Sequence, residues 1–402
     1  MKILFVTSSI PYPPRNGVEL PIVKLIQNLS LNHKIDLTVL ADKNSDINRT
    51  KSFKSFQNKY LNNFQIFKQK KENILISVLK ELFLIKPLFC KALNLNKKII
   101  NNKYDFIWFS PIGTIFSLNY LKFNKKKPKI VIGLHESTVL SYSSYARQIF
   151  KKTYKISIGS IIKTLRIPWI YYYEYRILKK VDLVTVQTNF EKEKLNKLYR
   201  NTFTKKTIIL TNGTISRKPS FSAKNKKKNI LFNSHLSIFR KNESDWFLTK
   251  VWPLVQKKNP DAILNIFGTP IKDKIKIKLF KDKNIILHGY IDNIEDIYSN
   301  MMISVLPTQH SLGWINRLSD SLVFGVPVVS CSGPLSTIPK IVNGKHALCA
   351  DTPKEFSESI NILLNDENKR RYISEEAIML SENFLNWEQT TKKIEKKMKS
   401  IL

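Results

Sequence analysis

Residues 303–337 read ISVLPTQHSLGWINRLSDSLVFGVPVVSCSGPLST, and this pattern predicts a strand, a loop, a helix and a second strand. The apolar run Ile303–Leu306 ends at a proline, which is typical of a buried strand. From Trp314 onward the apolar residues recur at helical spacing, and Gly325 is placed to end that helix. The apolar residues 326–331 then predict a second buried strand. Such a unit is typical of an open parallel sheet, which binds ligands at the carboxyl ends of its strands.

Arg317 and Asp320 lie three residues apart on the first turns of the predicted helix. A helix start favours anions, so the cation could bind a phosphate while the carboxylate binds sugar hydroxyls. The same two residues could equally form an ordinary surface ion pair, worth roughly 0.2–0.5 kcal/mol. The pair alone leaves both interpretations open.

The whole stretch resembles the donor-binding segment of the large retaining glycosyltransferase family numbered four, whose members have the GT-B fold. In that family a Gly, a Lys or Arg, a Glu and then Gly-x-Pro-Val-Val recur in this order. The matching residues here are Gly313, Arg317, Asp320, Gly325, Pro327, Val328 and Val329. Two positions depart from the pattern, because Asp320 replaces the usual Glu and Leu312 replaces a second Glu eight residues earlier. The resemblance therefore implies a donor site without the paired carboxylates.

The resemblance also implies a set of site residues. It assigns binding of a nucleotide-sugar donor to Gly17, Arg240, Lys241, His288, Gly289, Tyr290, Gly313, Trp314, Arg317 and Asp320, and catalytic roles to His135 and Asp320. His135 follows the apolar run 129–134, at the carboxyl end of a predicted strand. The family has a similar histidine that faces the sugar, although a lone histidine is often structural.

Apolar strands alternate with helical patterns in both halves of the chain, which predicts an α/β protein. With the resemblance, this becomes a GT-B fold of two doubly wound, Rossmann-like domains facing a central cleft. We expect an acceptor-side domain over residues 1–215 and a Lys-rich linker over 216–228. A nucleotide-sugar-binding domain should follow over 229–382, and a final helix over 383–402 should cross back to the first domain.

The chain of 402 residues carries a formal net charge of +36, spread along its length. Such a charge favours anionic partners, namely phosphorylated substrates, anionic lipid or nucleic acid. Lys-rich usage can also reflect the base composition of a genome. No nucleic-acid-binding motif is present, so we expect no nucleic-acid partner.

Two segments of the first half combine aromatic or apolar residues with lysine and arginine, at 73–86 and 164–180. Either could lie on an anionic membrane, or could simply pack against a protein core. No long uncharged apolar run is present, and the start MKILFVTSS has too short an apolar core for a signal peptide. We therefore expect a cytoplasmic enzyme, peripheral on the inner face of the cytoplasmic membrane, acting on a glycan or lipid-linked acceptor.

Cys90, Cys331 and Cys349 have no metal-ligand spacing, which fits a reducing compartment. No Asp-x-Asp motif occurs, and the resembled family needs no metal, so we expect neither a metal nor another cofactor. The implied activity is transfer of a sugar to a growing surface glycan, such as lipopolysaccharide or capsule, with retention. Because Leu312 and Asp320 depart from the motif, an inactive carbohydrate- or membrane-binding protein of the same fold is the alternative. The sugar, nucleotide, acceptor and oligomeric state are left open.

Overall fold

The computed structural model describes most of the chain, in two compact units. The described residues are 1–14, 17–41, 50–68, 104–120, 127–135, 137–150, 158–213, 227–232, 241–267, 282–289, 291, 293–309 and 313–402. The N-terminal unit comprises Met1–Asn212 and Trp387–Leu402, and the C-terminal unit comprises Gly213–Asn386. The two divisions fall three and four residues from the expected boundaries at 215 and 383, and the C-terminal unit takes in the expected linker, so it begins well before residue 229. Most of the expected linker 216–228 and the amphipathic segment 73–86 lie outside the described residues.

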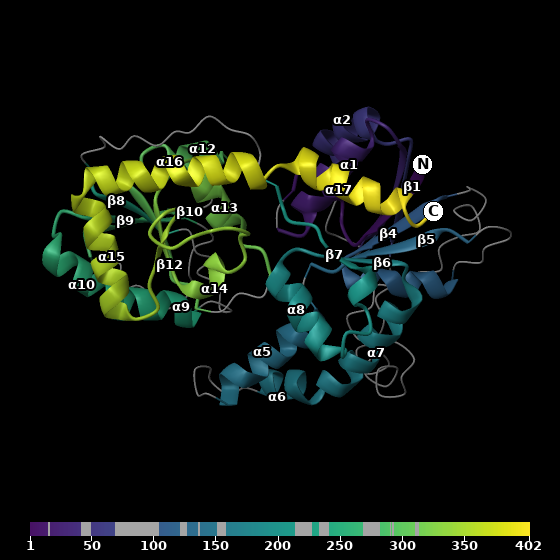
Figure 1. The fold of residues 1–402 in the computed structure, drawn as a ribbon, viewed down its shortest axis with the longest axis horizontal. Coiled ribbons are helices and arrows are strands. Elements are labelled where there is room, and N and C mark those ends of the chain that lie inside the picture. The colour runs from purple at the N-terminus through teal and green to yellow at the C-terminus, as the bar shows by residue number, and fades with distance from the viewer. Residues whose placement is uncertain are drawn as a thin grey trace. The chain divides into compact units, whose positions relative to one another are not determined.

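The N-terminal unit is built on a seven-stranded parallel sheet in the order β3-β2-β1-β4-β5-β6-β7 (Figure 1). Its strands are β1 Lys2–Thr7, β2 Lys34–Ala41, β3 Asn63–Lys68, β4 Phe106–Ser110, β5 Lys129–Gly133, β6 Leu183–Val186 and β7 Thr207–Ile209. The strand order reverses between β1 and β4, as in doubly wound sheets, and ligands bind such folds at the carboxyl ends beside the reversal.

Alternate residues of these strands pack into two cores, one on each face of the sheet. Leu4 and Phe109 belong to one core, with the helices α7 Ile167–Lys180 and α8 Asn189–Leu198. Phe5 and Trp108 stack at 5.5 Å in the other core, with the helix α1 Glu19–Leu29. Because both faces are covered, the strands are almost continuously apolar, which is why they could be predicted.

The C-terminal helix α17 Trp387–Lys399 belongs to the N-terminal unit, where it packs beside α1 (Figure 1). Ile394 and Met398 are fully buried in the same core as α1. Burying such a side chain contributes roughly 1.5–3 kcal/mol, so the apolar face of α17 is a substantial attachment. Thr391 accepts a hydrogen bond of 3.3 Å from Asn28 of α1 beside it.

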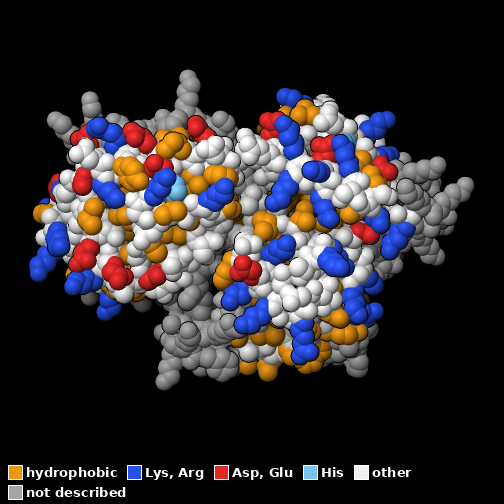
Figure 2. All heavy atoms as spheres, viewed as in Figure 1, with side chains coloured by type: hydrophobic (Ala, Val, Ile, Leu, Met, Phe, Trp, Pro, Cys, Tyr) orange, Lys and Arg blue, Asp and Glu red, His pale blue; other side chains and the backbone are white. Residues whose placement is uncertain are grey.

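Four further helices of this unit are α2 Thr50–Tyr60, α5 Thr138–Phe150, α6 Ile158–Leu165 and the 3₁₀ helix η2 Ile112–Tyr120. The large hydrophobic residues Ile161, Ile162 and Leu165 of α6 are exposed. Figure 2 shows hydrophobic side chains gathered at the foot of this unit, with lysine and arginine side chains beside them. None of the helices in the described part of the chain has the length and apolar content needed to span a bilayer.

The C-terminal unit contains a six-stranded parallel sheet in the order β10-β9-β8-β11-β12-β13. Its strands are β8 Asn229–Phe232, β9 Ile263–Phe267, β10 Ile285–Gly289, β11 Ile303–Leu306, β12 Val328–Ser330 and β13 Leu348–Cys349. The strand order reverses between β8 and β11. This reversal places the carboxyl end of β11, where the opening stretch begins its loop, at the expected ligand edge.

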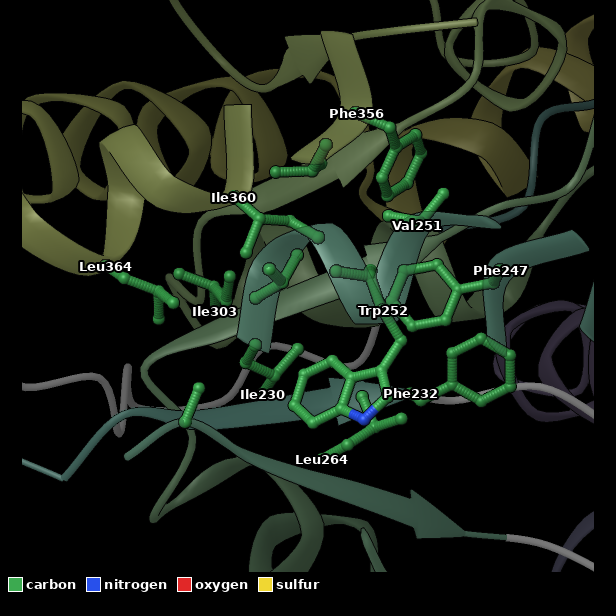
Figure 3. Close-up of a cluster of buried hydrophobic side chains, with 14 of the residues drawn as sticks. Ile230, Phe232, Phe247, Val251, Trp252, Leu264, Ile303, Phe356, Ile360 and Leu364 are labelled. Atoms are coloured by element: carbon green, nitrogen blue, oxygen red, sulfur yellow. The ribbon is translucent and has the colours of Figure 1, made fainter. Parts of the chain in front are cut away.

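One core of this unit joins the sheet to α15 Pro353–Asn365 and to a run of helices over 241–258 (Figure 3). Trp252, Phe247 and Phe356 are among its largest buried side chains. In this run, α9 Lys241–Trp246 continues through a π turn, Phe247–Val251, into α10 Trp252–Lys258. This continuation places Phe247, Val251 and Trp252 together on the buried side of the run.

The remaining helices are α12 Ile294–Tyr298, α13 Asn316–Val323, α14 Ser332–Leu335 and α16 Glu367–Phe384. The short helix α14 follows directly after β12. Its last residues, Pro334 and Leu335, are buried and hold this turn against the core. The predicted strand over 326–331 is shorter than expected, because only Val328–Ser330 pairs with its neighbours.

Candidate functional site

The opening stretch forms the predicted strand, loop and helix in the C-terminal unit. β11 has the predicted bounds, whereas α13 begins at Asn316 rather than at Trp314. Thr308, just beyond β11, donates a hydrogen bond of 3.1 Å to Glu243 of α9 and so ties the loop to that helix. Residues 310–312, including Leu312, lie outside the described residues.

Gly325 ends α13, as predicted, by adopting a conformation that other residues avoid. Its φ is +69°, and its N–H donates to the carbonyl of Leu322 at 3.1 Å. The N–H of Val326 donates to the carbonyl of Ser321 at 2.9 Å, which completes a Schellman motif. A Cβ on Gly325 would also lie 2.8 Å from Cδ1 of Ile378 on α16. The glycine thus sets both the end of α13 and its close approach to α16.

Arg317 and Asp320 are the second and fifth residues of α13, and both are partly buried. The N-cap residue, Ile315, provides no side-chain hydrogen bond to the first N–H groups of the helix. Such N–H groups and the helix dipole favour an anion at this end. The backbone carbonyl of Arg317 accepts hydrogen bonds from Tyr298 at 3.3 Å and Ser321 at 2.9 Å, which anchors this turn. The geometry suits a phosphate at the start of α13.

Trp314 packs inward from the loop before α13. Its side chain is buried among Leu306 and Leu318, and its indole N–H donates to Ser319 at 3.3 Å. Gly313, beside it, is partly buried. The tryptophan therefore fixes the path of the loop, and its ring packs in the hydrophobic core.

His288 lies near the end of β10, beside β9. Its Nε2 is 2.9 Å from Oδ1 of Asn265, and its ring stacks on Phe267 with 4.3 Å between ring centres. Burial lowers the pKa of His288. These residues line one side of a hollow whose lining residues are Lys227, Asn229, Asn265, Phe267, His288, Ile291, Asp296, Asn300 and Met301. Gly289 follows with a φ of +70°, and Tyr290 lies outside the described residues.

Of the other predicted donor residues, Gly17 is exposed just before α1, and Val18 caps that helix without a side-chain hydrogen bond. Glu19, in the first turn of α1, is buried and accepts a hydrogen bond of 2.9 Å from Ser9. A carboxylate here already complements the helix dipole, so this helix start favours a hydroxyl ligand over a second anion. Arg240 lies outside the described residues, and Lys241 is the first residue of α9.

His135 belongs to a row of polar side chains at the carboxyl ends of β4, β5, β6 and β7, which are neighbours in the sheet. Its Nε2 lies 2.6 Å from Oγ of Ser110, the last residue of β4. Its Nδ1 lies 3.3 Å from the amide nitrogen of Gln187, which follows β6. That amide nitrogen donates at 3.2 Å to Oδ1 of Asn212, which follows β7.

This row lines a small pocket of about 20 Å³ whose other walls are mainly apolar. The lining residues are Pro21, Ile22, Leu25, Trp108, Ser110, Gly133, Leu134, His135, Thr185, Val186, Gln187, Leu210 and Asn212. This volume holds roughly one water molecule and is far below the roughly 300–1,000 Å³ of small-molecule sites. A Cβ on Gly133 would lie 3.1 Å from Nε1 of Trp108 and 3.3 Å from Oγ of Ser110, so glycine allows these two side chains to pack closely against this wall. The pocket is too small for a sugar ring, and its convergent polar groups suit a single ligand oxygen or a water.

Burial lowers the pKa of His135 to about 4, so the imidazole is neutral at physiological pH. Sequence analysis singled out His135 but missed Ser110 and Gln187 as its partners. Each is a polar residue at the end of an apolar strand, and that position was the available signal. The strand order that makes them neighbours was not in the sequence. Within the described part of the chain, no group of three or more His, Cys, Asp or Glu residues could hold a metal ion.

Residues 227–366 match the family model of the glycosyl transferases of group 1. The matched region contains β8 to β13 and α13, and therefore the whole strand–loop–helix with Arg317 and Asp320. None of the curated proteins compared matches the chain.

Solved structures resemble the whole chain. HepE of Anabaena, in complex with UDP and glucose, matches with a TM-score of 0.66 and 14% identity over 100% of both chains. TarM of S. aureus, in complex with fondaparinux, α-GlcNAc-glycerol and UDP, matches with a TM-score of 0.70 and 12% identity over 99% of this chain and 100% of that chain. The lipopolysaccharide outer core galactosyltransferase WaaB matches with a TM-score of 0.64 and 13% identity over 100% of both chains.

The chain has the GT-B fold, with its two parallel sheets flanked by helices. At 14% identity the structural likeness shows the fold alone. The family model matches residues 227–366, which lie within the C-terminal unit. Fold and family match together support a glycosyl transferase.

Proposed function

We propose that this protein transfers a sugar from a nucleotide-sugar, with UDP as the nucleotide, to a growing surface glycan. The observation that carries the proposal is the match of residues 227–366 to the glycosyl transferases of group 1, which includes the anion-favouring start of α13. The UDP class is supported by the similar structures, since HepE is solved with UDP-glucose and TarM with UDP. WaaB, which acts on the lipopolysaccharide outer core, supports a surface-glycan acceptor.

In this proposal Arg317 and the first N–H groups of α13 hold the diphosphate of the donor. Negative charge develops on the diphosphate as the sugar leaves, and a preorganised cation with backbone donors stabilises that charge. No metal is required for this step. Asp320, one turn further along α13, accepts hydrogen bonds from ribose or sugar hydroxyls. His288, Gly289 and Tyr290 contact the base, and Arg240 or Lys241 assists at the diphosphate.

The polar row around His135 contacts the transferred sugar, whose anomeric configuration is retained. His135 is neutral and serves through hydrogen bonds, because its depressed pKa leaves it uncharged at physiological pH. A polar row set in apolar walls provides the orientation that such a reaction needs.

We further propose that the enzyme works on the inner face of the cytoplasmic membrane. The support is the exposed apolar face of α6, together with the +36 charge of the chain. Arg176 and Lys179 of α7 lie over the rings of Tyr172 and Tyr175 at 5.5 and 4.9 Å, so cations and aromatic rings are interleaved along α7, the helix that follows α6 in the chain. Such a surface suits anionic headgroups.

The test is a transfer assay with UDP-, GDP-, ADP- and dTDP-sugars, offered with lipid-linked and free glycan acceptors and read by mass spectrometry. A thermal-shift screen with the same nucleotides selects the donor first. We expect a stable product only with a UDP-sugar, and nuclear magnetic resonance of that product gives the anomeric configuration. Nucleotide binding without transfer to any acceptor would favour the inactive binding protein instead. Failure to bind any nucleotide would refute the proposed function.

A further inference from the structure

Ser110 and His135 lie close enough to share a strong hydrogen bond, with 2.6 Å between Oγ and Nε2. In many hydrolases a serine and a histidine at this distance form a nucleophile and its base. That arrangement requires Nε2 to accept the serine proton, and a carboxylate on the other side of the ring to accept from Nδ1–H. The group that faces Nδ1 therefore decides whether Ser110 or His135 is the donor in this hydrogen bond.

The group that faces Nδ1 of His135 is the amide nitrogen of Gln187, at 3.3 Å. An amide nitrogen can only donate, so Nδ1 must accept and must carry no proton. A neutral imidazole then carries its single proton on Nε2. Burial lowers the pKa of His135 to about 4, so this neutral form is the one present near pH 7. Nε2–H therefore donates to Oγ of Ser110.

The orientation of the Gln187 amide follows from its contact with Asn212, on the side away from His135. Its nitrogen also donates to Oδ1 of Asn212 at 3.2 Å, so the two amide hydrogens have two acceptors. The backbone N–H of Gln187 donates to Oε2 of Glu191 at 3.0 Å, and Thr188 caps the first turn of α8 by accepting from the N–H of Glu191 at 3.0 Å. The start of α8 thus holds Gln187 in place.

Once Oγ of Ser110 has accepted from His135, the hydrogen of the serine hydroxyl needs another acceptor. Within the described residues, Ser110 makes no second side-chain hydrogen bond. Ser110 is buried and lines the pocket beside Gly133. The serine hydroxyl can therefore donate its hydrogen bond into the pocket, where a ligand oxygen can accept it.

We propose that Gln187 is a positioning residue that holds His135 as the Nε2–H tautomer, so that Ser110 donates a hydrogen bond to an oxygen of the bound ligand. The identification of that oxygen with a sugar oxygen rests on the proposed function, whereas the tautomer does not. In this arrangement Ser110 is a donor for recognition. It is not a nucleophile, because His135 gives a proton to its oxygen instead of removing one.

The experiment is long-range ¹H–¹⁵N nuclear magnetic resonance on the full-length, ligand-free protein, deuterated and labelled with ¹⁵N-histidine. The chain has 6 histidines, and a His135→Asn spectrum assigns the signals of His135 by difference. The protonated and unprotonated ring nitrogens are well separated in such spectra. We expect Nε2 to carry the proton in the wild type.

Gln187→Glu tests the role of the amide, because a carboxylate accepts from Nδ1–H and should reverse the tautomer or charge the ring. Gln187→Met is nearly the same size without a donor, so it should leave a mixture of tautomers if the carboxylate variant fails to fold. Gln57→Glu, the same change on a partly buried face of α2, is the matched control and should leave the His135 signals unchanged.

A proton on Nδ1 in the wild type would overturn the proposal, as would an unchanged Nε2–H signal in both Gln187→Glu and Gln187→Met. Because the readout needs no substrate, its outcome is independent of the transfer assay. An Nε2–H tautomer in a protein without transferase activity would leave the positioning role standing and refute only the proposed function. Transfer activity with an Nδ1–H tautomer would support the proposed function and refute the positioning role of Gln187.

Discussion

The buried carboxylate of Glu174, on α7, accepts a hydrogen bond of 2.9 Å from the backbone N–H of Thr138, the first residue of α5. The same side chain accepts from Ser137 and from Tyr199. Burial raises the pKa of Glu174, although these donors counteract the shift. Glu174 thereby joins α5, α7 and the end of α8. Two of its donors, Ser137 and Thr138, follow His135 closely in the chain.

We expect Glu174→Leu to lower the free energy of unfolding by roughly 2–5 kcal/mol, because buried N–H and hydroxyl donors lose their acceptor. Glu174→Gln keeps one acceptor oxygen and should cost about 1–2 kcal/mol. Urea denaturation measures both variants. Glu193→Leu, an exposed glutamate on α8, is the control and should change stability by less than about 0.5 kcal/mol. Equal losses for the Leu and Gln variants would contradict the capping role.

Arg317→Ala should raise the Kd for the nucleotide by about tenfold or more, since about 1.5–3 kcal/mol of charge-assisted hydrogen bonding is lost. Calorimetry with UDP measures the change. Arg371→Ala is the matched control, because Arg371 pairs with Glu367 on an exposed face of α16 in the same unit. An unchanged Kd in a folded Arg317→Ala protein would remove this residue from the donor site.

Asp320→Asn should weaken binding of the nucleotide-sugar by about tenfold without changing the fold, since a neutral amide is a poorer acceptor for ribose or sugar hydroxyls. The same calorimetry applies, with Asp261→Asn as the control at an exposed ion pair with Lys228. If Asp320 serves only the helix surface, donor affinity stays constant and stability shifts by less than about 1 kcal/mol. That result would sink its assignment to the site.

The strands of this fold were predictable from sequence because parallel sheets are covered on both faces. Ile303–Leu306 is an apolar run that ends at a proline, and the structure confirms both of its bounds. Helix starts were less predictable. Trp314 continues the helical spacing, yet α13 begins at Asn316, because the indole packs into the core from the preceding loop. Tertiary packing decided that boundary.

The candidate site was predictable only where one continuous stretch carries it. Arg317 and Asp320 share a helix, so their spacing alone placed them together. Ser110 and Gln187 are 25 and 52 residues from His135, and only the order of the strands brings them into contact. Contacts between residues so far apart in the chain produce no periodic pattern in the sequence. The partners of His135 could therefore be found only after the sheet was known.

Lowering the pH should reduce the free energy of unfolding, and protonation of His135 should account for part of the loss. Its pKa in the folded chain, about 4, lies below the ordinary 6.5, so between these values only the unfolded chain binds the proton. The contribution is complete above pH 6.5 and is lost as pH falls toward 4, by up to roughly 3 kcal/mol at about 1.4 kcal/mol per pKa unit. Denaturation at pH 7 and pH 5 should show a smaller loss for His135→Asn than for the wild type. Identical losses would show that His135 is not a buried neutral group.

The exposed face of α6 should bind anionic membranes. Leu165 is 64% exposed and Ile162 is 49% exposed, and apolar insertion would add to the attraction of nearby cations, which contribute up to about 1 kcal/mol each. We expect co-sedimentation with anionic vesicles at low salt and release at high salt, where charges are screened. Ile162→Glu with Leu165→Glu should reduce this binding at least about tenfold through charge repulsion and lost insertion. Leu254→Glu, at an exposed leucine of α10 in the other unit, is the matched control. Low binding at low salt, equal for neutral and anionic vesicles, would end the membrane proposal and leave the charge as a by-product of composition.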